Sequence, residues 1–126
     1  MKTVEDLNRL IRNEIAAIEA LRREDEKIWS VRGGVPDDYA KRSKKIRRMI
    51  GNHNDEIAHL RRLIRFVEAT PEEGVRMMLD QLHGQVARIT ESADRYKTKE
   101  QKKEYLSNAG AQLKRAQVAE LEFLLR

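Results

Sequence analysis

Apolar side chains recur along the chain at intervals of three and four residues, in four separate stretches. Because an α-helix turns once in about 3.6 residues, this spacing places each set on one helical face. Each stripe is wide enough for the core of a helical bundle rather than the narrow seam of a two-stranded coil. The apolar positions are, in order along the four stretches, Val4, Leu7, Ile11, Ile18, Leu21 and Ile28; Ile46, Ile50, Ile57, Leu60, Ile64 and Val67; Val75, Met78, Leu79, Leu82, Val86, Ile89, Ala93 and Tyr96; and Leu106, Leu113, Leu121, Leu124 and Leu125.

Three breaks in this pattern separate the stretches. Residues 30–38 hold two glycines and a proline, whereas Thr70 and Pro71 match the N-cap and first position of a helix. Residues 97–100 form a weaker break without Gly or Pro, so the last two helices are either separate or continuous there.

The pattern as a whole predicts an all-α fold. Helices are expected over about 3–29, 37–68, 71–96 and 99–125. Short links favour antiparallel neighbours, which gives an up-down-up-down four-helix bundle forming a single domain over 1–126.

Composition narrows the functional classes. The 126 residues include no cysteine, which excludes disulfides, thiolate metal sites and cysteine nucleophiles. No glycine-rich phosphate loop or nucleophile elbow is present, so we expect binding rather than catalysis. No apolar stretch is long enough for a membrane span or a signal peptide, and we expect a cytoplasmic protein without membrane contact.

Several polar residues fall within or beside the apolar stripes. Extending the stripes places Glu14, Asp25 and His53 at core-facing positions, where a carboxylate needs a partner, a proton or a metal. A turn near residue 34 sets Glu14 opposite about residue 55, and the later turns bring His83 to a similar level. The candidate ligands for iron, manganese or zinc are Glu14, His53, Glu56, His59 and His83. The alternative is a structural polar layer that fixes the register of the bundle.

These segments resemble a known family. Residues 7–21 resemble the first helix of small bacterial ferritin-like four-helix bundles, in which the glutamate matching Glu14 is an inward metal ligand. Residues 52–64 resemble the second helix, and His83 with residues 117–121 echo the third and fourth. The resemblance implies a ferritin-like bundle with a metal site in its core.

The metal motif of that family is incomplete in the second half of this chain. Members carry a tyrosine seven residues after the first glutamate, where this chain has Leu21. They also carry an acid and a histidine near the positions of Ala116 and Gln117. A metal site would therefore need further ligands, which a homo-oligomer would supply.

The positive charge is concentrated in one segment. The net charge is +5, and residues 41–65 hold nine basic and two acidic side chains. Eight of the cations flank the second apolar stripe and are here called the basic ridge: Lys41, Lys44, Lys45, Arg47, Arg48, Arg61, Arg62 and Arg65. Such a ridge either pairs with the acidic runs at 23–26 and 37–38, or contacts an anionic partner, which is a nucleic acid or an acidic protein.

These observations lead to three functional hypotheses. The first is a non-catalytic interaction protein with a degenerate ferritin-like polar core, which binds a protein partner or a second copy and uses the basic ridge. The second is a ferritin-like metal-binding protein. The third is a nucleic-acid-binding accessory protein that uses residues 41–65.

Overall fold

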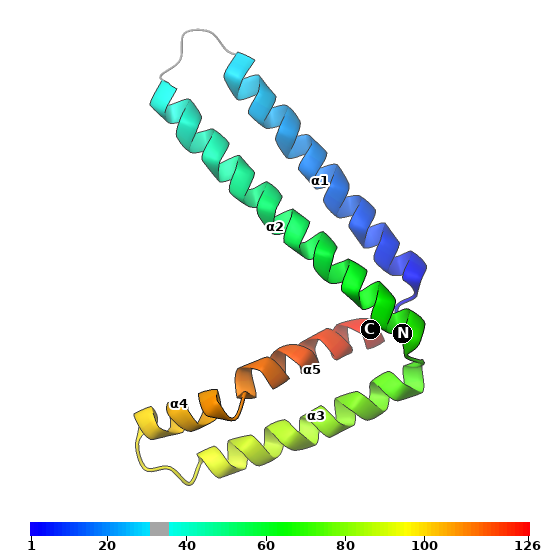
Figure 1. The fold of residues 1–126 in the computed structure, drawn as a ribbon, viewed down its shortest axis with the longest axis vertical. Coiled ribbons are helices and arrows are strands. Elements are labelled where there is room, and N and C mark those ends of the chain that lie inside the picture. Colours follow the sequence, from blue (N-terminus) through cyan, green and yellow to red (C-terminus); the bar gives the residue numbers. More distant parts are fainter. Residues whose placement is uncertain (31–35) are drawn as a thin grey trace. The chain divides into compact units, whose positions relative to one another are not determined.

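The computed structural model describes residues 1–30 and 36–126, and every regular element in that part of the chain is an α-helix (Figure 1). The helices are α1 (Val4–Ser30), α2 (Pro36–Ala69), α3 (Glu72–Ala93), α4 (Lys99–Asn108) and α5 (Ala111–Leu125). The prediction of an all-α fold is confirmed. Most of the first predicted link, residues 31–35, lies outside the described residues.

The chain divides into two compact units. The first, called the hairpin, comprises Thr3–Ala69 and contains α1 and α2. The second unit comprises Thr70–Arg126 together with Met1–Lys2, and it contains α3, α4 and α5. The up-down-up-down bundle of four helices stays a prediction.

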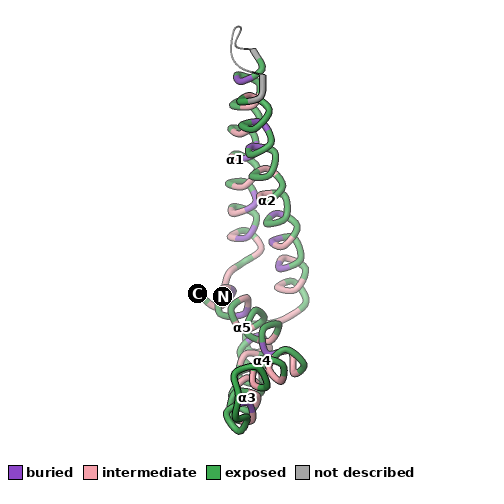
Figure 2. The backbone as a smooth tube through the Cα atoms, turned by 90° about the vertical axis from the view of Figure 1, so that its left-hand side faces the viewer, coloured by how far each residue is buried: buried purple, intermediate pink, exposed green. Residues whose placement is uncertain are grey.

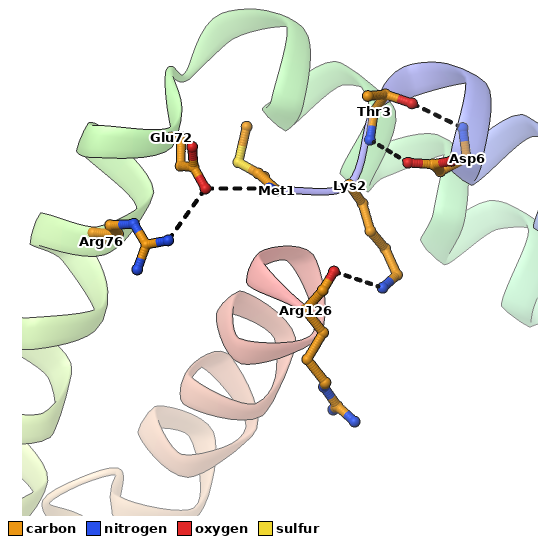
Figure 3. A network of polar contacts seen from close by, with 7 residues as sticks. All are labelled: Met1, Lys2, Thr3, Asp6, Glu72, Arg76 and Arg126. Atoms are coloured by element: carbon orange, nitrogen blue, oxygen red, sulfur yellow. Dashed lines mark hydrogen bonds and ion pairs between the residues drawn. The ribbon is translucent and has the colours of Figure 1, made fainter.

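The hairpin pairs two long uninterrupted helices, of 27 and 34 residues. A reciprocal capping box opens α1, since the Thr3 N–H donates to Asp6 Oδ2 at 2.9 Å and the Asp6 N–H donates to Thr3 Oγ1 at 3.1 Å (Figure 3). The predicted apolar stripes supply seven of the eight buried apolar residues in the described part of the hairpin: Leu7, Ile11, Ile18, Ile28, Ile46, Ile57 and Leu60. The eighth, Leu63, lies outside the predicted stripe. Figure 2 colours the buried positions along the backbone purple.

The second unit is built from shorter helices. Residues 94–98 separate α3 from α4, which settles the continuity that the sequence left open. The helix expected over 99–125 is divided in two, because Gly110 adopts a left-handed conformation with φ 71° between α4 and α5. The N-cap of α3 is Pro71 rather than the predicted Thr70.

Three side chains assigned to the apolar stripes of this unit are exposed, which corrects the predicted core. Leu113 is 66% exposed in the first turn of α5, because the break at Gly110 changes the orientation of the helix there. Tyr96 lies beyond the end of α3 and contacts the ring of Tyr105, with 5.1 Å between ring centroids. Met78 is exposed on α3. The remaining core is small: Val75, Ala93, Ala111, Leu121 and Leu124.

Lys2 attaches the start of the chain to the end of α5. Its backbone N–H donates to the Leu124 carbonyl at 2.7 Å, and its ammonium group lies 4.6 Å from the centroid of the Phe123 ring. Lys2 Nζ also reaches the Arg126 carbonyl at 3.5 Å (Figure 3). Carbonyls at the end of an α-helix lack partners within the helix, so Lys2 acts as a cap on α5.

The α-amino group of Met1 binds the first turn of α3. Its nitrogen lies 3.1 Å from Glu72 Oε1, which also accepts a hydrogen bond from Arg76 at 3.2 Å (Figure 3). The ammonium group, followed by the guanidinium of Arg76, lowers the pKa of the Glu72 carboxyl below its ordinary value.

No helix in residues 1–30 and 36–126 combines the length and the apolar character that crossing a membrane requires.

Candidate functional site

The polar pair predicted for the hairpin is present. His53 Nδ1 on α2 contacts Glu14 Oε2 on α1, as the spacing around the first turn predicts. The two side chains are 25% (Glu14) and 31% (His53) exposed, so they lie at the edge of the seam between the helices. The contact joins α1 to α2 at one register, which is the role expected of a structural polar layer.

The seam continues with polar groups toward the far end of the hairpin. One carboxylate oxygen of Asp25, Oδ1, is enclosed and has no hydrogen-bond partner among the described residues. Ser43 is buried on α2 and accepts a hydrogen bond from Trp29 Nε1 at 3.3 Å. The ring of Trp29 meets that of Tyr39 edge to face, with centroids 6.5 Å apart.

The other candidate metal ligands lie elsewhere. Glu56 is exposed on α2, and His59 Nδ1 lies 3.4 Å from a nitrogen of Arg62 on the same helix. His83 belongs to the second unit, where its Nε2 lies 3.5 Å from Glu122 Oε1 on α5.

The metal hypothesis therefore rests on two ligands brought together, Glu14 and His53. Within the described ranges, no three His, Cys, Asp or Glu side chains gather in a way that could hold a metal ion. Zinc sites in proteins have three or four protein ligands, and ferritin-like di-iron sites have more than four. The pair alone does not fit such a centre.

The basic ridge runs along α2. Successive residues of a helix are separated by about 100°, so Lys44, Arg48 and Arg62 lie nearly opposite the buried Ile46. All eight ridge side chains are exposed. None of them forms an ion pair with a carboxylate of the described residues, including Glu24, Asp25, Glu26 and Asp38. The ridge is thus not paired with these four acids, and the side chain of Asp37, the other predicted partner, lies outside the described residues.

The ridge consists of two clusters. Five of the ridge cations fall within 41–48 and three within 61–65, while Asp55 and Glu56 lie between them. With a rise of about 1.5 Å per residue, the clusters are separated by about 20 Å and the whole ridge spans about 36 Å. The span is close to one turn of B-form DNA, about 34–36 Å.

Two shallow grooves flank the seam of the hairpin. One, of about 270 Å³, contains Ile15, and the other, of about 260 Å³, contains Met49. Both side chains are about 40% exposed, so each side of the hairpin keeps some apolar surface in water.

A larger groove, of about 810 Å³, lies in the second unit where α4 meets α5. The residue pattern did not predict it, because Leu106 and Leu113 keep helical spacing across the break between the two helices. The one signal is Gly110, which follows Asn108 and Ala109 in a weakly amphipathic segment.

The chain matches no known family model, and neither characterised proteins nor solved structures show significant similarity to it. The ferritin-like resemblance thus depends on the motifs around Glu14 and His53 in the sequence itself.

Proposed function

We propose that the protein acts by binding, without a catalytic step, and that the basic ridge of α2 contacts the phosphate backbone of a nucleic-acid duplex. The observation that carries this proposal is the set of eight exposed cations on one helix without carboxylate partners in the described chain. Cations without carboxylate partners need not break an ion pair before they neutralise phosphates.

The form of the ridge favours a duplex and disfavours base recognition. No aromatic side chain lies between residues 41 and 65, so the stacking that single strands require is absent from the ridge. Contacts to phosphates position a protein on a duplex but carry no sequence information. We therefore expect binding that depends little on sequence and strongly on salt. If all eight cations engage phosphates of B-form DNA, the slope of log K against log salt approaches about −7.

Fluorescence anisotropy with a labelled 16-base-pair duplex, measured across a range of salt concentrations, tests the proposal. We expect binding in low salt that the Lys44→Glu/Lys45→Glu/Arg47→Glu/Arg48→Glu variant loses. The matched control reverses four exposed cations of α1: Arg9, Arg12, Arg22 and Arg23. It changes the net charge equally and should bind much more tightly than the ridge variant. Equal loss in both variants, or salt-insensitive binding, would contradict the proposal. Tighter binding to polyglutamate than to the duplex would assign the ridge to an acidic protein instead.

For the polar core we propose a structural role in a degenerate ferritin-like bundle. The support is the contact between Glu14 and His53, which pairs the two groups without further ligands around them. Added Fe(II), Mn(II) or Zn(II) should leave the melting temperature unchanged. A rise in the melting temperature that Glu14→Ala abolishes would instead favour the metal-binding hypothesis.

For the architecture we retain the antiparallel four-helix bundle as a proposal, with self-association through apolar surface. The support is the pairing of helices within each unit and the partial exposure of Ile15 and Met49. Small-angle scattering tests the four-helix bundle, and dimensions other than those of such a bundle would contradict it. Light scattering tests self-association, and a monomer would contradict it.

A further inference from the structure

The groove between α4 and α5 has an apolar floor. The helix that begins at Lys99 ends at Asn108, and the left-handed Gly110 is the N-cap of α5, which starts at Ala111. The apolar residues that line the groove, here called its floor, are Leu106 from α4 and Ala111, Leu113 and Ala116 from α5. Leu113 is 66% exposed, more than any other large apolar side chain of the described residues. The groove thus holds apolar surface that its own unit leaves in water.

The charged residues that line the groove, here called its rim, are all basic. Lys99, Lys102, Lys103 and Arg115 line it, together with the neutral polar side chains of Ser107 and Gln112. None of its lining residues is acidic. The acids of α4, Glu100 and Glu104, do not line the groove.

Most of these cations lack a partner. Lys102 forms an ion pair with Asp94 at 2.7 Å, whereas Lys99, Lys103 and Arg115 form none with the described residues. The exposure of all three keeps them available to a partner. An apolar floor between unpaired cations is complementary to a ligand with an apolar stripe and acidic flanks.

From this complementarity we infer that the α4–α5 groove docks an acidic amphipathic helix of a partner protein. Apolar side chains spaced three and four residues apart would cover Leu106 and Leu113, and Asp or Glu beside that stripe would pair with Lys99, Lys103 and Arg115. A volume of about 810 Å³ accommodates a few such side chains. This surface belongs to the second unit and is independent of the basic ridge on α2.

Anisotropy with a labelled synthetic helix tests the inference. The probe is an 18-residue peptide with leucines three and four residues apart and glutamates on both flanks. A scrambled peptide of the same composition keeps the charge and loses the apolar stripe. We expect the amphipathic peptide to bind at least tenfold more tightly than the scrambled one. Equal affinity for the amphipathic and the scrambled peptide would mean that net charge alone drives binding, and it would overturn the inference.

Variants of the protein locate the site. Leu113→Glu removes apolar floor and adds a negative charge at an exposed position, and we expect at least a tenfold loss of peptide affinity. The matched control is Met77→Glu on α3, which is also highly exposed (60%) but lies outside the groove and should bind as before. Circular dichroism melts check that both variants fold. The variant Lys103→Glu/Arg115→Glu is a second test, because it leaves Leu113 in place and should also lower the peptide affinity.

Three outcomes decide between occupants. Retained affinity in Leu113→Glu and in Lys103→Glu/Arg115→Glu would overturn the assignment to this groove. A dimer by light scattering that Leu113→Glu converts to a monomer, without peptide binding, would assign the groove to a second copy and also overturn it. The ridge variant Lys44→Glu/Lys45→Glu/Arg47→Glu/Arg48→Glu should keep full peptide affinity, because none of its four positions lines the groove.

Discussion

The two units of this protein use the same helical spacing with different results. In the hairpin, α1 and α2 run without a break, and the positions predicted to be buried include Leu7, Ile18 and Ile57, which are buried. In the second unit a single glycine divides the last helix, and Leu113 turns from a core position into an exposed one. A break in the helix therefore ends the agreement between periodicity and burial at Leu113, although continuity alone does not ensure burial, since Met78 is exposed on the unbroken α3.

The two units also place their cations differently. In the hairpin, the eight cations of the basic ridge lie along one long helix, which gives an extended line of charge. The second unit gathers them around an apolar hollow at Gly110. An extended line is suited to a polymer of regularly spaced charges, and a rimmed hollow is suited to one amphipathic segment.

The largest expected effect comes from removing core side chains, one in each unit. Ile18→Ala in the hairpin and Leu121→Ala in the second unit each empty a site that is 5% exposed. Each should lower the free energy of unfolding by about 2–5 kcal/mol. Hydrogen exchange should show lost protection mainly in the unit that carries the substitution. Equal loss of protection in both units for either variant would mean that they unfold as one body.

A pair of glycine substitutions tests the break between α4 and α5. Gly110→Ala places a side chain at φ 71°, which should cost about 1–2 kcal/mol of stability. Gly51→Ala is the control, because Gly51 lies inside α2 and should gain about 0.5–1 kcal/mol. An added Cβ meets no atom within 4 Å at either position, so backbone conformation alone distinguishes them. Thermal unfolding measures both, and a gain in Gly110→Ala would indicate that α4 and α5 join into one helix.

A double-mutant cycle compares the polar contacts of the two units. Glu14→Gln and His53→Gln should show a coupling of about 0.5–1.5 kcal/mol, because the pair is only 25–31% exposed. The contact between Lys102 and Asp94 is 43–60% exposed, and its coupling should stay below about 0.5 kcal/mol. Urea titrations of the single and double variants measure both couplings. A larger value for the exposed pair would contradict the structural role of the Glu14–His53 contact.

The smallest effect concerns the carboxyl of Glu72. Its pKa in the folded protein is lowered from an ordinary value of 4.5, chiefly by the α-amino group of Met1 and then by Arg76. Its contribution to stability is therefore complete above that ordinary value and is lost as the pH falls through the lowered pKa. The melting temperature of the unmodified protein should exceed that of Glu72→Gln at neutral pH and approach it in acid. A difference that grows on acidification would contradict the assignment.

The contact between Glu14 and His53 could be predicted because two simple patterns agree in the hairpin. Both residues extend apolar stripes of continuous helices, and one turn fixes the register between them. The expected level of His83 depends on one further turn, near residue 71, and stays a prediction. Within the second unit His83 lies beside Glu122, and the sequence contains no pattern that pairs these two residues.

The groove could not be predicted for a physical reason. Leu106 and Leu113 are seven residues apart, which satisfies helical spacing whether or not the helix continues between them. Only the left-handed conformation of Gly110 changes where Leu113 points, and a single glycine is tolerated in many helices. The cations around it belong to residues 66–126, where ten basic and ten acidic side chains balance. The net charge of that segment therefore does not reveal a local excess of cations in the groove.

Because Lys2 is attached to Leu124, the second unit is built from two segments that are separate in the sequence. The chain starts in the second unit, leaves it at Thr3 for the hairpin, and returns at Thr70. The hairpin is therefore an insertion in the topological sense, flanked on both sides by segments of one unit. Since Lys2 contacts the carbonyls of Leu124 and Arg126, a short linker between these two segments, with a new opening in the exposed link at 95–97, would give a circular permutant in which a covalent bond replaces these contacts.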